Sequence, residues 1–428
     1  MTVTHTQFDG LFELNPQSGR CPYTTYSQVR EEAPLWVERL NAFMVTRYDD
    51  VVSVLSDAQT YSSAMASVPA SVTPLARKIS EDPNASAILR GQLQRRLEIS
   101  RSAVLLNADP PIHVRQRKLV NKGFTARRIA ALEPEVHAIA NDLIDTFIDV
   151  GQVDLVQEFA IKLPMAVIAN ILGVPKSMTD TLKWWSDSFA AETGNLNLTH
   201  DELEDMFSAV DQFYDYFTSQ IADRRVRPRD DLLTDLVRAS VSGEEPLTLN
   251  EILQMLVQFL IAGNETTTNL LASIMYKLVT DHNLMTRVRH DHKEIRALTE
   301  EVLRLEPPVQ GLFRIANEDV EIGGTPIPAG SLIWLVYGSA NRDRSAYPAA
   351  DDLDLDGALS RQHLAFGKGE HFCLGAPLAR MEAGISIEIL LSRLDDIRLD
   401  CAPNDVKYLP NVVLHGLKAL PLTFRKVV

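Results

Sequence analysis

Residues 366–375 read Phe-Gly-Lys-Gly-Glu-His-Phe-Cys-Leu-Gly (FGKGEHFCLG), and this segment decides the fold. Its glycines, Gly367, Gly369 and Gly375, allow tight turns and let a flat partner approach the backbone closely. The segment runs directly into APLARMEAGISIEILL, which has the composition of a helix. The positive end of that helix and free backbone amides would lower the pKa of the Cys373 thiol, stabilising the thiolate that metals require. The alternative to a reactive thiolate is an inert, buried cysteine, and the neighbouring residues argue against it.

The overall composition restricts the classes of partner. A formal net charge of −15 argues against nucleic acid and anionic membranes, because both are bound through an excess of Lys and Arg. The three cysteines, Cys21, Cys373 and Cys401, neither form a disulfide framework nor match a zinc-binding spacing. The N-terminus lacks a signal-peptide pattern and no apolar stretch of about 18 residues occurs, so we expect a cytoplasmic protein without a membrane segment.

Helical patterns dominate the chain, and strand patterns are confined to a few places. Thr248 and Glu251 form a capping box, after which an apolar helix is predicted to run to about Asp281, roughly 50 Å. A hairpin is predicted around Leu40-Asn41, and further strands within residues 319–338 and 420–428. No repeat or flexible linker divides the sequence, so we expect one mainly α domain over residues 1–428 with a small β region.

The interior of the long helix contains Ala262-Gly263-Asn264-Glu265-Thr266-Thr267-Thr268, an unusual composition for such a position. A glycine there costs about 1 kcal/mol relative to alanine, and threonines add smaller penalties. One interpretation is a helix-packing glycine with threonines that bond back to the preceding turn. The other is a helix that opens locally because the opening serves a function.

The FGKGEHFCLG segment resembles the cysteine-loop signature of the cytochromes P450. The resemblance covers nearly the whole chain, because the other landmarks of that family follow in the same order. It implies the cytochrome P450 fold, with haem b (iron protoporphyrin IX) between the long central helix and the cysteine loop. Cys373 would then be the axial ligand of the haem iron, where a thiolate favours cleavage of the O–O bond.

The same resemblance assigns roles to residues of the long helix and of the haem surroundings. Gly263 would leave space for dioxygen, while Glu265 and Thr266 would form an acid–alcohol pair that delivers protons to it. The remaining cofactor-binding residues that the resemblance implies are Ala262, Phe366, Gly367 and Gly375, with four propionate donors, His113, Arg117, Arg314 and His371. By itself, the pair His113 and Arg117 would more often be a solvated helix face.

The Glu301-Val302-Leu303-Arg304 segment fits the family's E-x-x-R pair, a structural element that fixes the meander before the cysteine loop. The sequence departs from the family in that meander. Asp351 and Asp352 occur where the family usually has an arginine that completes a triad with the pair. Arg361 is the candidate replacement.

A lipophilic small-molecule substrate follows from the apolar character of the segments that would line the site by family position. The residues expected there are Val309, Gln310, Leu312, Phe313, Val413 and Leu414. Gln310 and His415 are the candidate polar anchors. Terpenoid, steroid, fatty acid, aromatic and macrolide-like substrates all remain open at this point.

A basic run between Pro111 and Leu132 contrasts with the acidic chain and includes no acidic residue. Such a run is usually a solvated face, but it would also steer an acidic electron donor. Because the chain contains no flavin or nicotinamide domain, we expect electrons from a ferredoxin, supplied by a ferredoxin reductase and NAD(P)H. The basic residues concerned are Arg115, Arg117, Lys118, Lys122, Arg127 and Arg128, with Lys368 on the cysteine loop.

The predicted activity is monooxygenation, in which one atom of O2 enters the substrate by hydroxylation or epoxidation. Two alternatives remain: a peroxide-driven haem peroxygenase, and a non-catalytic haem-thiolate sensor or binding protein. The first would not need the acid–alcohol pair of Glu265 and Thr266, and the second usually carries a signalling domain. We expect a monomer.

Overall fold

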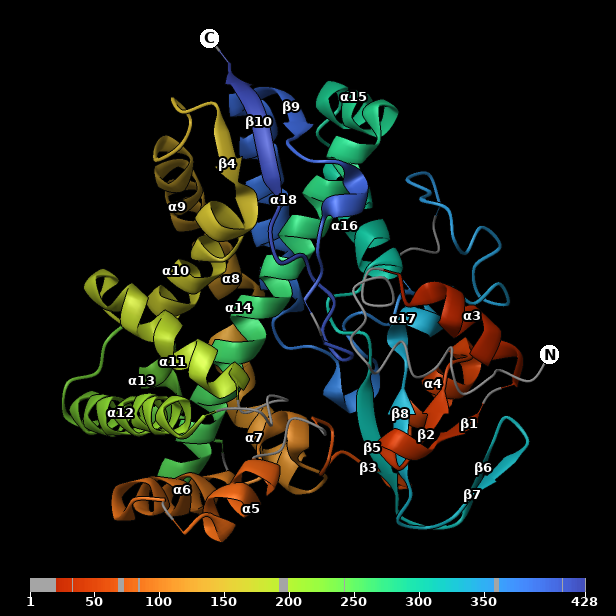
Figure 1. Ribbon diagram of the computed structural model, residues 1–428. Helices are drawn as coiled ribbons and strands as arrows, with labels where there is room; N and C mark the ends of the chain where they lie inside the picture. The colour runs from red at the N-terminus through yellow and green to blue at the C-terminus, as the bar shows by residue number, and fades with distance from the viewer. Residues whose placement is uncertain are drawn as a thin grey trace. The chain divides into compact units, whose positions relative to one another are not determined.

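Helices form most of the computed structural model, as its ribbon shows (Figure 1). The structure describes residues 21–32, 34–67, 73–83, 85–191, 199–241, 243–357, 362–409 and 411–427. Within these ranges no helix is long and apolar enough to cross a membrane. The chain divides into two compact units: unit 1 comprises Met1–Ser62, Ile129–Pro164 and Glu265–Val428, and unit 2 comprises Ser63–Arg128 and Met165–Asn264. The expected class, mainly α with a small β region, is confirmed.

Unit 1 contains the main sheet, whose strand order is β1-β2-β8-β5-β3. The predicted hairpin around Leu40-Asn41 is confirmed, because β1 pairs antiparallel with β2 on either side of it. Strand β2 also pairs in parallel with β8, and β8 in turn pairs antiparallel with β5. The strands of this sheet are β1 (Leu35–Val37), β2 (Ala42–Val45), β3 (Tyr61–Ser62), β5 (Leu312–Ala316) and β8 (Leu332–Leu335).

Two smaller sheets also belong to unit 1. The first has the order β4-β10-β9, and the second is a two-stranded ribbon of β6 and β7. The strands predicted within residues 319–338 and 420–428 are therefore confirmed, whereas β4 and β9 were not predicted. These strands are β4 (Gln152–Asp154), β6 (Val320–Ile322), β7 (Thr325–Ile327), β9 (Leu394–Leu399) and β10 (Pro421–Lys426).

The helices of unit 1 include α18, which follows the cysteine loop and packs against α9 and α16. Figure 1 shows α18 and α16 in the same region of the molecule as the β4-β10-β9 sheet. The helices are α3 (Tyr23–Glu32), α4 (Tyr48–Leu55), α9 (Glu133–Asp145), α15 (His282–His290), α16 (Glu294–Leu305), α17 (Tyr337–Ala340) and α18 (Ala376–Arg393), with short helical turns at Glu38–Leu40, Val156–Ala160, Gly369–His371 and Pro403–Asp405.

Unit 2 is built from helices whose apolar faces pack on one another. Trp185, Phe189, Phe213 and Phe217 form an aromatic cluster between α11 and α12, all at most 2% exposed. The helices are α5 (Thr73–Glu81), α6 (Ala87–Ser100), α7 (Ile112–Val120), α11 (Thr179–Ala191), α12 (His200–Val226) and α13 (Leu232–Val237), with short turns at Leu105–Asn107, Asn121–Phe124 and Lys176–Met178. Helices α8 (Ala126–Ala131) and α10 (Lys162–Ile171) each contain one of the boundaries between the units.

Helix α14 (Leu249–Thr280) confirms the long helix predicted from the capping box. The Thr248 amide donates to the Glu251 carboxylate at 2.8 Å, and the Glu251 amide donates to the Thr248 hydroxyl at 3.2 Å. The helix continues without interruption through residues 262–268, so the expected local opening is absent. One reason is that the Thr268 hydroxyl donates to the Ala160 carbonyl at 2.9 Å, and so does not compete for the helix's own carbonyls.

Candidate active site

The cysteine loop forms the tight turn that its glycines predict. The Cys373 amide donates to the Phe366 carbonyl at 2.9 Å, which closes the loop. Gly367 and Gly369 have φ values of +69° and +71°, a conformation that only glycine adopts without strain. A Cβ on Gly369 would also collide with the carbonyl oxygen of Leu55. Sequence and structure therefore agree on why these two positions are glycine.

Helix α18 begins at Ala376, directly after the loop, with Gly375 as its N-cap residue. Cys373 thus lies three residues before an 18-residue helix, where the helix dipole favours a negative charge. Its side chain is partly exposed rather than packed into the core. Gly375 has an ordinary φ of −84°, and a Cβ there would lie 4.0 Å from the cysteine Sγ, so unit 1 itself leaves room for a side chain.

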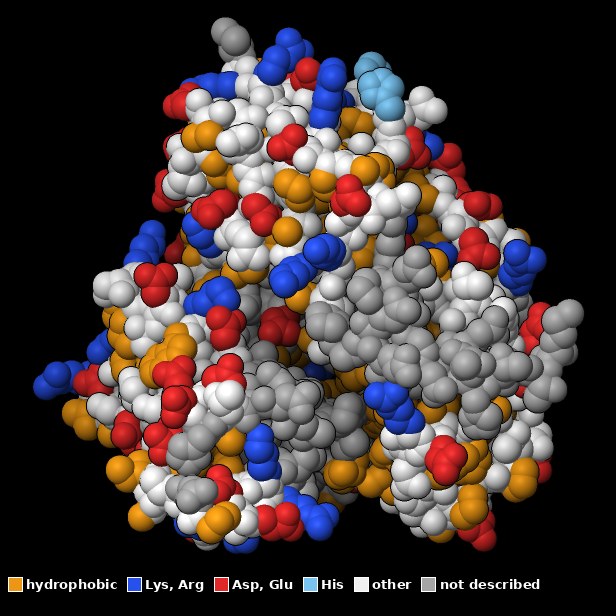
Figure 2. All heavy atoms as spheres, in the orientation of Figure 1, with side chains coloured by type: hydrophobic (Ala, Val, Ile, Leu, Met, Phe, Trp, Pro, Cys, Tyr) orange, Lys and Arg blue, Asp and Glu red, His pale blue; other side chains and the backbone are white. Residues whose placement is uncertain are grey.

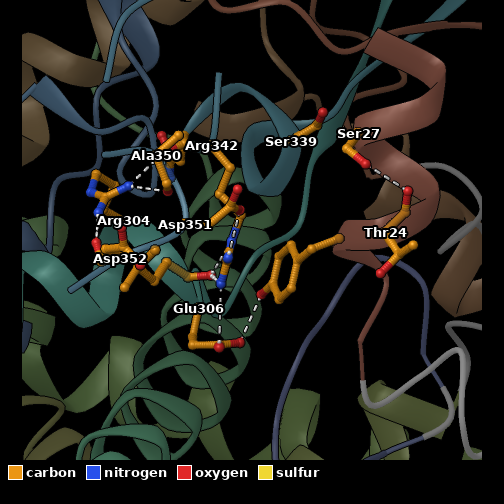
Figure 3. A network of polar contacts seen from close by, with 12 residues as sticks. Thr24, Ser27, Arg304, Glu306, Ser339, Arg342, Ala350, Asp351 and Asp352 are labelled. Atoms are coloured by element: carbon orange, nitrogen blue, oxygen red, sulfur yellow. Dashed lines mark hydrogen bonds and ion pairs between the residues drawn. The ribbon is translucent and has the colours of Figure 1, made fainter. Parts of the chain in front are cut away.

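The predicted E-x-x-R pair is present on α16 and is almost completely buried. Arg304 donates from Nε and Nη2 to the two oxygens of Glu301, both at 2.8 Å, and each side chain is 3% exposed. Arg304 also donates to the carbonyls of Ala350 and Asp352, both at 2.7 Å, and the Asp354 amide donates to Glu301 at 2.8 Å. Figure 3 shows Arg304 pointing toward these carbonyls. The pair therefore holds the meander through the meander's own backbone.

This geometry accounts for the missing meander arginine. Backbone carbonyls already take up the outer donors of Arg304, so the pair is satisfied without a third side chain. Asp351, one of the two acidic residues at the position where the family has its arginine, instead forms an ion pair with Arg342 at 3.2 Å. Arg361, the candidate replacement, lies outside the described residues.

A second buried network in unit 1 surrounds Glu306, and sequence analysis did not find it. The carboxylate accepts from Tyr23 at 2.8 Å and lies 2.8 Å from the Lys277 ammonium and 3.2 Å from Nε2 of His415. Figure 3 shows Arg342 pointing toward Glu306. The two charged groups are 3.5 Å apart, and the Arg342 guanidinium lies over the Tyr23 ring. Burial alone would raise the pKa of Glu306, but the His415 hydrogen bond and the nearby cations hold it well below its usual range.

The position of His415 differs from its expected role as a polar substrate anchor. Its side chain is 4% exposed, pairs with Glu306 and stacks on the Tyr408 ring with centroids 4.7 Å apart. Its backbone amide donates to the Pro308 carbonyl at 2.9 Å. His415 therefore fixes the segment that carries Val413 and Leu414.

The residues expected to line a substrate site lie on two neighbouring segments of unit 1. Val309 and Leu414 form an antiparallel bridge, and the Gln310 amide donates to the Val413 carbonyl at 2.7 Å. The side chains of these residues differ in exposure: Val309, Leu312, Val413 and Leu414 are partly exposed, whereas Gln310 and Phe313 are buried.

The burial of Gln310 and Phe313 is contrary to expectation and has a geometric cause. Successive side chains of a strand point to opposite faces, so Leu312 and Phe313 cannot face the same ligand. The Phe313 ring stacks on Trp334 with centroids 6.0 Å apart. The side-chain Nε2 of Gln310 donates to the Pro307 carbonyl at 2.8 Å, so this side chain is bound to the backbone.

Of the four expected propionate donors, Arg314 and His371 belong to unit 1 and His113 and Arg117 to unit 2. Arg314 is 3% exposed and donates to the Phe313 carbonyl at 2.7 Å. His371 ends the short helical turn of the cysteine loop. His113 and Arg117 lie one turn apart on α7, the first buried and the second partly exposed.

Helix α7 begins at Ile112 without a side-chain cap, and its N-cap residue is Pro111. The Asp109 carboxylate, two residues earlier, accepts a hydrogen bond from the Ser63 amide at 2.6 Å. The side chain fixes the segment before α7 rather than the first turn of the helix.

Four of the residues to which the family resemblance assigns roles lie close together on α14. Ala262 and Gly263 belong to unit 2, and Glu265 and Thr266 belong to unit 1. A Cβ on Gly263 would lie 3.6 Å from Ile168, an ordinary contact distance. The packing of unit 2 therefore does not require glycine at position 263.

The basic run of α7 and α8 is partly neutralised inside unit 2. Arg115 forms an ion pair with Glu251, Lys118 pairs with Glu244 at 2.6 Å, and Arg128 pairs with Asp230 at 2.8 Å and with Asp235. Lys122 donates to the Ser240 carbonyl at 2.7 Å. On the face in Figure 2, basic and acidic side chains are likewise interspersed.

The donor set fits a metal that brings most of its own ligands. Among the described residues, no group of three or more His, Cys, Asp or Glu side chains could hold a metal ion. Cys373 offers one sulfur at a helix N-terminus, on a loop whose glycines keep the backbone free of side chains. One sulfur ligand beside such a loop suits an iron porphyrin, in which the macrocycle supplies four nitrogens.

Comparisons with known proteins agree with this chemistry. The model of the family described as Cytochrome P450 matches residues 46–399. Cytochrome P450 107B1 of Saccharopolyspora erythraea is 34% identical over 407 residues, with 94% of each chain covered. The mycinamicin IV hydroxylase/epoxidase of Micromonospora griseorubida is 35% identical, covering 93% of this chain and 94% of that protein. The structure of cytochrome P450 CYP109Q5 from Chondromyces apiculatus is 33% identical with a TM-score of 0.83, covering 97% of this chain and 98% of its own.

Proposed function

Because the chain belongs to the cytochrome P450 family, which are oxidoreductases that use haem b, we propose that it hydroxylates or epoxidises a lipophilic small molecule with O2. The observation that carries the proposal is the closed turn of the cysteine loop, with Cys373 before α18. The family model spans parts of both units, and we further propose that residues 1–428 work as one domain around one haem.

In this proposal each residue of the candidate site has a defined task toward the cofactor. When bound, haem b supplies an iron that, with a thiolate ligand, cleaves the O–O bond. Cys373 would hold the iron through its thiolate. The groups that donate to the propionates are His113, Arg117, Arg314 and His371, and the residues beside the macrocycle are Ala262, Phe366, Gly367 and Gly375.

Two adjacent residues of α14 would manage the protons of the reaction. R–H, O2, two electrons and two protons give R–OH and water, so each cycle requires two protons in the site. The Thr266 hydroxyl would donate a hydrogen bond to the oxygen, and the Glu265 carboxyl would relay protons from solvent. Gly263 would leave room for the oxygen, which the ordinary 3.6 Å distance to Ile168 supports because packing gives no other reason for glycine.

The electrons would come from a ferredoxin, with a ferredoxin reductase and NAD(P)H. The ion pairs of unit 2 reduce the field of the basic run, so we expect Arg115, Lys118 and Arg128 to contribute little to steering the ferredoxin. The loop residue Lys368 and the exposed Arg127 are the better candidates for direct contact.

Among the substrate classes left open by the sequence, the name of one relative favours a macrolide-like or other polyketide molecule. That relative is the polyketide biosynthesis cytochrome P450 PksS of Bacillus subtilis, 33% identical over 414 residues and similar over nearly its whole length. The partly exposed side chains of Val309, Leu312, Val413 and Leu414 are apolar, which suits such a molecule.

The first test is the carbon monoxide difference spectrum of the reduced protein, recorded beside Cys373→His. A red-shifted Soret band that the variant loses is expected. A band unchanged in the variant would refute ligation by Cys373.

Turnover separates the activities. Product formed with ferredoxin, reductase, NADPH and O2 supports the monooxygenase, and product formed with hydrogen peroxide alone supports a peroxygenase. Glu265→Gln and Thr266→Ala should increase NADPH consumption per product, because protons no longer reach the oxygen in step with the electrons. Unchanged coupling in both variants would count against their assigned roles.

A further inference from the structure

The Phe366 ring, at the start of the cysteine loop, is held by a charged side chain of α18. The guanidinium of Arg380 lies over this ring, 4.5 Å from its centroid, which is a favourable cation–π distance. The carbonyl of the same phenylalanine accepts the Cys373 amide at 2.9 Å. The residue that closes the cysteine loop is thus also the residue that Arg380 covers.

Arg380 is fixed in turn by Glu300 of α16. Its Nε and Nη2 donate to the two carboxylate oxygens at 2.6 and 2.8 Å, a bidentate arrangement that defines the plane of the guanidinium. Burial alone would raise the pKa of Glu300, but the hydrogen bonds from Arg380 and His363 lower it to about 2. A buried carboxylate, 8% exposed, therefore faces a guanidinium that is 35% exposed, close to the cysteine loop.

His363 completes the enclosure of the Phe366 ring. Its Nδ1 accepts a hydrogen bond from the Ala365 amide at 3.2 Å, and its Nε2 lies 3.3 Å from a carboxylate oxygen of Glu300. The imidazole lies 5.7 Å from the Phe366 ring, centroid to centroid. Glu300 thus holds both groups that flank the phenylalanine.

Glu300 and Glu301 are neighbours on α16 with separate tasks. Glu301 pairs within its own helix and holds the meander, whereas Glu300 crosses to α18 and reaches the cysteine loop. We propose that the opposite charges of Glu300 and Arg380, beside the loop that carries Cys373, tune the reduction potential of the haem. This rests on the proposed function, because it requires Cys373 to be the iron ligand.

The sign of the effect follows from electrostatics. Reduction adds an electron to the iron, so removing the negative charge of Glu300 should favour reduction and raise the potential. Removing the positive charge of Arg380 should lower it. A pair that only held the loop in place would move the potential in the same direction when either partner was lost.

The experiment measures the potential of purified haem-loaded Glu300→Gln, Arg380→Gln and the double variant by spectroelectrochemistry. We expect about a tenfold change in the reduction equilibrium for each single variant, in opposite directions, equivalent to about 59 mV for one electron. The double variant should return toward wild type. Glu294→Gln, on the same helix but paired with Arg287, is the matched control and should change little.

The outcomes are distinguishable from failure of the proposed function. If wild type lacks the red-shifted carbon monoxide band, the proposed function fails first. If wild type has the band but both single variants shift the potential the same way, or no more than Glu294→Gln, the inference is wrong. Should one single variant fail to fold, the sign of the other and the position of the double variant still decide.

Discussion

The ion pairs of α16 and those of α7 and α8 join the same kinds of charged side chain but differ in how far these side chains are buried. Glu301 and Arg304 are each 3% exposed, and all their strong contacts are within the protein. Lys118 and Glu244 are 53% and 21% exposed, and water solvates much of both groups. The first kind holds backbone segments in place, while the second mainly reduces the local charge of a surface.

This difference predicts unequal energies for similar distances. Removing one partner of a buried pair leaves a charge without compensation and typically costs about 3–5 kcal/mol. Exposed pairs contribute about 0–1 kcal/mol, because water and salt screen the attraction. Four experiments break or sharpen the contrast.

The largest effect is expected for Arg304→Ala. It leaves the Glu301 carboxylate buried without its cation and frees the carbonyls of Ala350 and Asp352. Urea unfolding should show a loss of about 3–5 kcal/mol. Lys118→Ala is the exposed control, and equal losses in the two variants would contradict the comparison.

Glu382 extends the contrast to a buried acid that has no cationic partner among the described residues. It lies within α18, its Oε2 accepts no hydrogen bond from the described residues, and burial raises its pKa to about 8. Because the folded pKa exceeds the unfolded value of 4.5, this group favours the fold most below pH 4.5 and loses that contribution as pH rises toward 8. Glu382→Gln should therefore stabilise the protein at pH 8 by about 3 kcal/mol and flatten the pH dependence above pH 5. A destabilised variant with an unchanged pH profile would show that the carboxylate has a partner after all.

Glu306 tests the reverse case, a buried acid with several cations. Its folded pKa lies below the unfolded value of 4.5, so its contribution is present above pH 4.5 and is lost as pH falls further. Glu306→Gln should lose about 2 kcal/mol at pH 7, since the charge-assisted hydrogen bonds weaken. The variant should also unfold less steeply on acidification than wild type. Parallel acid titrations of the two proteins would rule this out.

The smallest effect is expected for Lys118 and Glu244. A double-mutant cycle of Lys118→Ala and Glu244→Ala, followed by urea unfolding, should give a coupling below about 1 kcal/mol. The coupling should shrink further in 1 M salt, where the screening length is about 3 Å. A coupling as large as that of the α16 pair would remove the distinction between the two regions.

Local signals explain what could be predicted from the sequence. The capping box of Thr248 and Glu251, the hairpin around Leu40-Asn41 and the glycines at 367 and 369 all concern residues within a few positions of one another. Their conformations follow from nearby chemistry. The cysteine loop was recognisable for the same reason.

Contacts between distant segments explain what could not be predicted. Glu306 and His415 are separated by 109 residues, and Lys118 and Glu244 by 126, so neither pair leaves a local pattern. The substitute for the meander arginine consists of backbone carbonyls, which no residue type reveals. The burial of Gln310 and Phe313 depended on which faces of neighbouring strands are covered.

The segment between Tyr408 and Leu417 has a consequence for the evolution of this protein. The two residues form a bridge at its base, the Leu409 amide donates to the Gly416 carbonyl at 2.9 Å, and His415 is fastened to Glu306. Val413 and Leu414 are held by backbone contacts to Gln310 and Val309, while their side chains are partly exposed, so these side chains can be substituted with little cost to the rest of unit 1. Descendants of this chain could therefore acquire new ligands through these two side chains while the fold around them stays unchanged.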